Sequence, residues 1–163
     1  VGDGKDEADG FRAKNQMIVL ASGSDQYFAF GDVTYQMINS RGGNDSIVGA
    51  QGAINNSFYG DSISLSYSKG GNDRLIGSDA ADFNNLYGDA DTLSRSKGGS
   101  DLLVGGTNAD VNNLFGDAIA MLGDLATMSV GGNDTLTAAT ALPLIIYLAM
   151  QFIRVILFVE MIF

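Results

Sequence analysis

Aspartate recurs at two fixed places in a repeated stretch of this sequence. Four related segments, "SRGGNDSIVG", "SKGGNDRLIG", "SKGGSDLLVG" and "SVGGNDTLTA", carry an aspartate two positions after a pair of glycines, at Asp45, Asp73, Asp101 and Asp134. A second aspartate ends "FYGD", "LYGD" and "LFGD", at a constant spacing from the first, at Asp61, Asp89 and Asp117. Carboxylates in such a pattern can bind a hard cation, or they can act in pairs as general acids and bases.

The regular repetition favours metal binding over catalysis. Stacked copies would hold equivalent carboxylates about 5 Å apart, where like charges cannot all stay ionised without a neutralising partner. Ca²⁺ takes roughly 6–8 oxygen ligands, whereas Mg²⁺ demands a tighter octahedral site. The alternative, that the aspartates only cap turns and are screened by water, stays open, above all for the second set.

The composition excludes several kinds of chemistry. The 163 residues include no His and no Cys, so a disulfide, a thiolate nucleophile, a histidine base and the usual zinc sites are excluded. The net charge of −10 argues against a nucleic-acid partner. Because the acids are periodic and no base accompanies the hydroxyl groups, we expect no enzyme activity. The lack of cysteine and a first residue other than Met fit a processed extracellular protein or a segment of one.

The repeats have a period of about 28 residues, which is in the range typical of solenoid proteins. The glycine pairs begin at positions 42, 70, 98 and 131; the last interval is longer than the others, and its extra residues follow Asp117. A degenerate copy precedes the first pair by one repeat, with Gln16 at the place of the first aspartate and Asp32 at that of the second. We therefore divide a solenoid domain, 1–140, into units 13–41, 42–69, 70–97, 98–130 and a partial unit 131–140.

Each unit contains short apolar runs bounded by Gly, Asn and Asp, which is typical of strands and not of helices. The pattern predicts an all-β protein, a parallel β-solenoid of about four to five coils, in which equivalent residues stack in columns. Three apolar columns are expected to form the core: Ile18, Ile47, Leu75, Leu103 and Leu136; Phe58, Leu86 and Leu114; and Leu65, Leu93 and Met121.

Three further columns are expected at the surface or at turns. Tyr59, Tyr87 and Phe115 form an aromatic column, interpreted as ladder packing, with carbohydrate stacking as the alternative. Asn56, Asn84 and Asn112 are expected to form an amide ladder that closes a turn. Arg41, Lys69 and Lys97 precede the glycine pairs and can serve as counterions to the acidic columns.

The "GGND" segments beside "LYGD" resemble the RTX (repeats-in-toxin) family of calcium-binding repeats. The resemblance covers about 42–138 and implies a parallel β-roll with Ca²⁺ in its turns, exported by type I secretion. It implies Asp45, Asp73, Asp101 and Asp134 as ligands, with carbonyl groups from Gly43, Gly71, Gly99 and Gly132. We add as candidates the neighbouring Asn44, Asn72 and Asn133 and the second aspartate set.

The chain also departs from the pattern of that family. The family coil has about 18 residues and two such turns. Here the coil is longer by about half, and it contains one complete turn motif. The resemblance therefore implies a single calcium-rich edge and a wider cross-section.

The last segment, 141–163, has no Gly or Asn and only two charges, at Arg154 and Glu160. Four interpretations are open: an element packed on the solenoid or inserted into a neighbouring subunit, a membrane anchor, a secretion signal, or a product of the reading frame. The first predicts assembly contacts from the apolar residues Leu144, Ile145, Ile146, Phe152, Ile153, Ile156, Leu157 and Phe158.

These observations favour an extracellular, calcium-stabilised structural protein. Its open solenoid ends would associate head to tail with other copies, into fibres or a surface layer. The alternative is a calcium-binding module of a larger secreted enzyme, toxin or adhesin. Carbohydrate is a weaker candidate partner, and a membrane contact through 141–163 is not favoured.

Overall fold

The computed structural model describes residues 5–22, 26–123, 128–138 and 153–157, in which every regular element is a β-strand. Sheet 1 contains β1 (Lys5–Asp9), β4 (Val33–Ile38), β7 (Ser64–Ser66), β10 (Thr92–Ser94) and β13 (Ala120–Leu122). Sheet 2 contains β2 (Met17–Val19), β5 (Ser46–Val48), β8 (Arg74–Ile76), β11 (Leu102–Val104), β14 (Asp134–Ala138) and β15 (Ile153–Leu157). Sheet 3 contains β3 (Gln26–Phe30), β6 (Asn55–Tyr59), β9 (Phe83–Tyr87) and β12 (Val111–Phe115).

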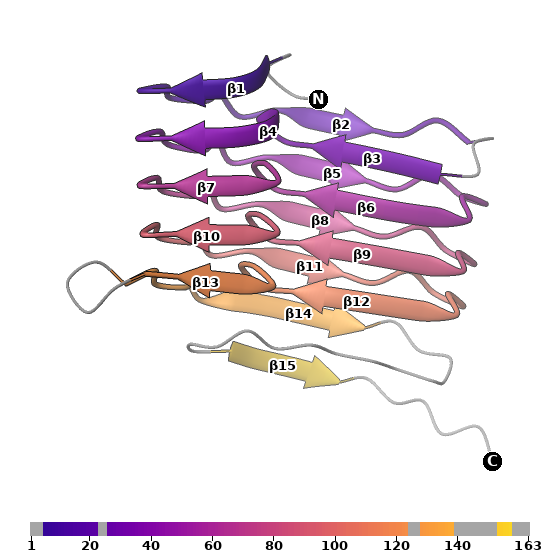
Figure 1. Ribbon diagram of the computed structural model, residues 1–163. Helices are drawn as coiled ribbons and strands as arrows, with labels where there is room; N and C mark the ends of the chain where they lie inside the picture. The colour runs from indigo at the N-terminus through magenta and orange to yellow at the C-terminus, as the bar shows by residue number, and fades with distance from the viewer. Residues whose placement is uncertain (1–4, 23–25, 124–127, 139–152, 158–163) are drawn as a thin grey trace.

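The strands form a parallel β-solenoid of about four turns, which confirms the predicted fold class. Each coil passes from sheet 2 to sheet 3 and then to sheet 1, as in β5, β6 and β7. Figure 1 shows that sheets 3 and 1 lie end to end in one layer with strands pointing the same way, while sheet 2 forms a second layer that runs in the opposite direction. The solenoid is therefore a flattened coil with three sheets in two layers.

The register between coils follows the sequence repeat. Arg74 in β8 pairs with Ser46 in β5 and with Leu102 in β11, so these coils are offset by one repeat each. The next step, from Leu102 to Thr135 in β14, is longer. Since β13 still pairs with β10 at the regular offset, the extra residues of this step lie between β13 and β14.

Two separate apolar cores fill the solenoid. The first lies between sheets 2 and 3 and consists of Ala29, Ile47, Phe58, Leu75, Leu86, Leu103, Leu114 and Leu136. The second lies along sheet 1 and consists of Val33, Met37, Leu65, Ala90, Leu93 and Ala118. Burial of each large side chain contributes about 1.5–3 kcal/mol before the entropy cost. The two cores contain most of the predicted columns; Ile18 and Met121 pack against them only half-buried.

Ladders of identical side chains stabilise the corners. Asn56 donates to Asn84, and Asn84 donates to Asn112, each over 2.9 Å, which confirms the predicted amide ladder. A serine ladder was not predicted: the backbone N–H of Ser68 donates to the hydroxyl of Ser96, 3.0 Å away, and the same contact joins Ser40 to Ser68. The signal was present, because each of these serines occupies the same place before a glycine pair.

Part of the C-terminal segment continues the solenoid. β15 pairs in parallel with β14 of the same chain, with Val155 opposite the core residue Leu136. Of the predicted assembly residues, Ile153, Ile156 and Leu157 lie in β15. The other five, Leu144, Ile145, Ile146, Phe152 and Phe158, lie outside the described residues. Within the described ranges, no helix has the length and apolar character that a membrane span needs.

Candidate metal centre

Both aspartate columns lie inside the protein, where the two apolar cores meet. Asp61 follows β6 and precedes β7, so it lies at the junction of sheets 3 and 1. Asp73 immediately precedes β8, in the opposite layer. The eight aspartates of the two columns are at most 3 % exposed: Asp32, Asp45, Asp61, Asp73, Asp89, Asp101, Asp117 and Asp134. These carboxylates are therefore enclosed between the layers, and the implied calcium-rich edge stays a prediction.

The glycines of both motifs make room for the carboxylates. A Cβ atom on Gly60 would overlap the carboxylate of Asp73 and the carbonyl oxygen of Gly88. A Cβ atom on Gly70 would overlap the carboxylate of Asp89. The motifs "YGD" and "GGND" thus pack against each other: the glycine of each motif leaves the space that an aspartate of the other motif occupies.

Backbone N–H groups hold the carboxylates in place. The Oδ1 atom of Asp73 accepts a hydrogen bond from the N–H of Asp45 over 2.6 Å, and that of Asp101 accepts from the N–H of Asp73 over 2.7 Å. In the other column, both oxygens of Asp61 accept from the N–H of Gly71, at 3.2 Å each. Such bonds fix the direction of each carboxylate and favour its charged form.

Several carboxylate oxygens are left without a hydrogen-bond partner. The Oδ2 atoms of Asp73, Asp101 and Asp117 are buried and accept no hydrogen bond from the residues that the structure describes. Two clusters place one oxygen from each of three carboxylates within 4.8 Å of one another: Asp61, Asp73 and Asp89, and then Asp89, Asp101 and Asp117. Oxygens that share one Ca²⁺ at about 2.4 Å lie at most about 4.8 Å apart, so both clusters have dimensions that fit one ion.

The carboxylates of the two clusters cannot all be charged at once unless a proton or a cation neutralises them. Burial, reinforced by neighbouring carboxylates, raises the pKa well above the ordinary value of 3.8 for Asp61, Asp73, Asp89 and Asp101. Burial also raises the pKa of Asp134 to about 7. Side chains of successive coils, such as Asp89 and Asp117, lie within hydrogen-bonding reach of each other. Two carboxylates can occupy such positions only with a proton or a cation between them.

The other predicted ligands take different positions. Asn44, Asn72 and Asn133 are exposed on the outer side of the corner, away from the buried clusters. The glycines Gly43, Gly71, Gly99 and Gly132 direct their N–H groups to the second aspartate column. Their role as carbonyl ligands stays a prediction.

A different set of carbonyl groups lies beside the clusters. The carbonyl oxygen of Gly88 is next to Oδ2 of Asp73, and that of Gly116 is next to Oδ2 of Asp101. Sequence reasoning missed these groups and treated the second aspartate column as the less certain one. The repeat carried no signal for these groups, because it describes which residues stack along the axis and not which residues meet across the coil.

The aromatic column is a continuous stack. Phe30, Tyr59, Tyr87 and Phe115 lie with ring centroids 4.5–5.0 Å apart and with planes within 9° of parallel. The rings therefore cover one another's faces, which confirms ladder packing and leaves no face between them for a sugar.

The resemblance to the RTX family rests on the sequence motifs. Comparison of the chain with family models, curated proteins and solved structures finds no match to any of them. The interpretation of the acidic clusters as a metal centre consequently depends on burial, geometry and donor chemistry.

We predict that Gly88→Ala destabilises the protein far more than Gly52→Ala. An alanine at Gly88 would collide with backbone and with Asp101, so we expect a loss of more than about 3 kcal/mol in the free energy of unfolding. Gly52 has open space around it and φ of +79°, so its substitution should cost only about 1–2 kcal/mol. Urea unfolding in calcium measures both; equal losses would refute the account of the glycines.

We predict that, in a chelating buffer, stability falls as the pH rises. A carboxyl group with a raised pKa keeps its proton in the native state at pH values where the unfolded chain has lost it. For Asp134 this contribution is complete below pH about 4 and is lost as the pH rises through its pKa of about 7. The other buried aspartates act in the same direction.

Urea unfolding in EGTA between pH 5 and 8 measures this effect. Saturating Ca²⁺ should flatten or reverse the trend, because the ion binds the deprotonated carboxylates. Stability in chelator that increases with pH over this range would contradict the prediction.

Proposed function

We propose that this chain is a calcium-stabilised structural β-solenoid that acts outside the cell. The observation that carries the proposal is the pair of buried three-carboxylate clusters, in which the Oδ2 atoms of Asp73, Asp101 and Asp117 have no hydrogen-bond partner among the described residues. An unpaired buried charge costs several kcal/mol, so the folded chain needs cations or protons at these positions.

Calcium suits the clusters better than other common metals. Within the described residues the donors are oxygen atoms only, from carboxylates and from carbonyl groups such as that of Gly88. Oxygen donors select hard cations, and the absence of His and Cys removes the ligands that zinc and copper prefer. Mg²⁺ retains several waters, and carboxylates that are at most 3 % exposed leave little room for them.

The position of the clusters gives the ions a structural role. Asp61 belongs to one coil, whereas Asp73 and Asp89 belong to the next, so a bound ion would join two coils. Asp89 takes part in both clusters, which links neighbouring sites. A site that exists only between folded coils couples cation binding to folding. Extracellular calcium is abundant enough to fill weak sites of this kind, which supports the proposed location and agrees with the RTX resemblance.

The ends of the solenoid support a second part of the proposal, self-assembly into filaments. At one end the sheets finish with β1, β2 and β3, and at the other with β13, β15 and β12. In the described part of the chain, no further strand pairs with these edges. Open parallel edges bind other strands, and two different ends that fit each other produce a head-to-tail filament.

We predict opposite effects of Asp89→Asn with and without calcium. At pH 8 in EGTA the substitution removes one buried charge from both clusters, so the free energy of unfolding should rise by at least about 1 kcal/mol. In calcium it removes a ligand from both sites, so the Ca²⁺ concentration for half-maximal folding should rise by about tenfold or more. Circular dichroism at increasing Ca²⁺ and urea unfolding measure the two effects.

Asp82→Asn is the matched control, because Asp82 is exposed and lies outside the clusters. It should change neither quantity appreciably. If the wild type forms its full β structure in EGTA at pH 8 and shows no response to Ca²⁺, the proposed function is wrong.

We predict calcium-dependent filaments. The stacked coils should fold fully only when their buried carboxylates are neutralised, and only folded ends can associate. The purified chain should therefore form filaments in Ca²⁺ and dispersed particles in EGTA, as seen by negative-stain electron microscopy. Monodisperse monomers in both buffers would refute the assembly part and leave the metal centre untouched.

A further inference from the structure

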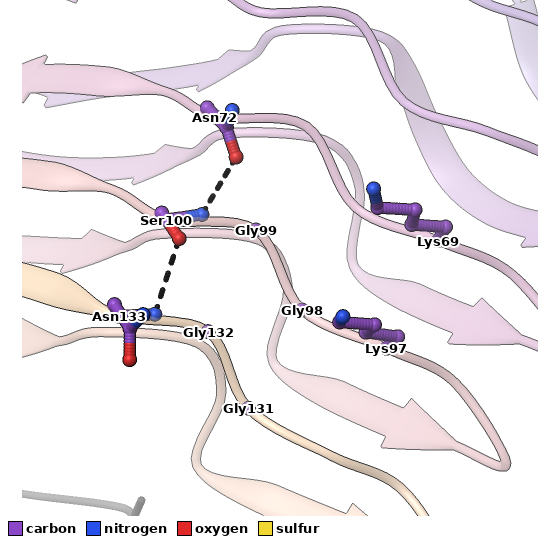
Figure 2. Close-up of a pocket in the computed structure, with 9 residues that line it drawn as sticks. All are labelled: Lys69, Asn72, Lys97, Gly98, Gly99, Ser100, Gly131, Gly132 and Asn133. Atoms are coloured by element: carbon purple, nitrogen blue, oxygen red, sulfur yellow. Dashed lines mark hydrogen bonds between the residues drawn. The ribbon is translucent and has the colours of Figure 1, made fainter. Parts of the chain in front are cut away.

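A groove runs along the outer side of the corner formed by the glycine pairs. It encloses about 160 Å³ and is lined by Lys69, Asn72, Lys97, Gly98, Gly99, Ser100, Gly131, Gly132 and Asn133. Figure 2 shows the lysines along one side, the asparagines and Ser100 along the other, and bare glycine backbone between them. No part of the metal centre proposed above uses these side chains.

One wall of the groove belongs to a column of positive charge. Backbone bridges place Arg12, Arg41, Lys69 and Lys97 in register, one per coil, and all four are exposed. The corresponding residue of the next coil is Val130, where the column ends. These four residues are nearly half of the nine Lys and Arg residues of the chain. Because equivalent positions repeat at the strand spacing of about 4.8 Å, the column forms a continuous positive strip.

Among the residues that the structure describes, no acid lies in an ion pair with any of these four cations. The buried aspartates lie behind the glycine backbone. The prediction that they are counterions to the acidic columns therefore finds no direct contact in support. Within the described ranges, the positive strip therefore remains available to an external anion.

The opposite wall offers hydrogen-bond donors. The side-chain oxygen of Asn44 accepts from the N–H of Asn72 over 2.9 Å, and that of Asn72 accepts from the N–H of Ser100 over 2.8 Å. The hydroxyl oxygen of Ser100 accepts from the N–H of Asn133 over 3.2 Å. Since the backbone occupies these acceptors, the amide NH₂ groups and the hydroxyl hydrogen remain to face a ligand. The groove thus presents donors and positive charge, which is the chemistry that binds anions.

The net negative charge of the chain does not prevent anion binding in the groove. Eight of the 19 acids are the buried aspartates of the metal centre. Neutralising those eight takes the formal net charge from −10 to −2. This step rests on the proposed function, and it leaves the basic strip as a strong local feature on a weakly charged surface.

We propose that the groove binds a linear acidic polysaccharide, which lies along the solenoid axis. A repeat of donors at every coil suits a polymer with regularly spaced anionic groups better than a single small anion. The amide and hydroxyl donors suit the sugar hydroxyl groups, and the cations suit carboxylate or sulfate groups. No aromatic side chain lines the described groove, whereas single-stranded nucleic acid is bound by stacking of bases on aromatic rings.

The test compares two variants of equal net charge in calcium buffer. Lys69→Gln/Lys97→Gln removes two cations from the groove, and Arg74→Gln/Arg95→Gln removes two cations that lie outside it. Binding is measured to hyaluronate, which carries only carboxylates, to dextran sulfate, to neutral dextran and to a thymidine oligonucleotide. Circular dichroism with added Ca²⁺ checks that both variants keep the wild-type calcium response.

We expect the wild type to bind at least one acidic glycan in a salt-sensitive manner and not to bind neutral dextran. The groove variant should bind about 10- to 100-fold more weakly, and the control variant within about twofold of the wild type. Tighter binding of hyaluronate would identify carboxylate as the preferred anionic group, and tighter binding of dextran sulfate would identify sulfate. The inference is overturned if no acidic glycan binds, if both variants lose affinity equally, or if the oligonucleotide binds as tightly as the glycans. An intact calcium response in that case would leave the proposed function standing.

Discussion

The structure depends on how two rows of buried carboxylates are neutralised. In most proteins the interior is apolar and acids lie at the surface. Here the apolar interior is divided into two cores, and the two rows of aspartates lie where these cores meet. The leucine and phenylalanine columns stabilise stacking, whereas the aspartate columns oppose it when charged. The same coil repeat that builds the core therefore builds a charge conflict that only protons or cations resolve.

This constraint explains why the glycines and aspartates occur together. Gly60 leaves space for Asp73 of the following coil, and Gly70 leaves space for Asp89. The backbone N–H groups of Gly71 and Asp45 then orient the carboxylates. A single coil has neither a closed core nor a complete acidic cluster, because both are formed between coils. Under the proposed function, cohesion along the solenoid and cation binding are consequently one property of the stack.

The sequence was sufficient to predict the fold class and most of the interior. The regular period determines which residues stack. The stacking of Leu75 on Leu103 and the amide ladder of Asn84 could therefore be predicted from the sequence alone. The meeting of the two aspartate columns could not be foreseen, because it depends on how sheets 1 and 3 join end to end opposite sheet 2. The period of the sequence repeat predicts which residues stack along the solenoid axis, but it does not predict which residues meet across one coil. Asn72, which the sequence offered as a ligand, is exposed in the structure, and its role as a ligand stays a prediction.

The central claim is that cations occupy the buried clusters. An anomalous difference map, from crystals grown in calcium and measured at a long X-ray wavelength, tests it directly. The account predicts one peak among Asp61, Asp73 and Asp89 and another among Asp89, Asp101 and Asp117, with the Oδ2 atoms of Asp73 and Asp101 as ligands. Ordered clusters without anomalous density, with the carboxyl groups joined by short hydrogen bonds to one another, would show that protons neutralise the rows and would contradict it.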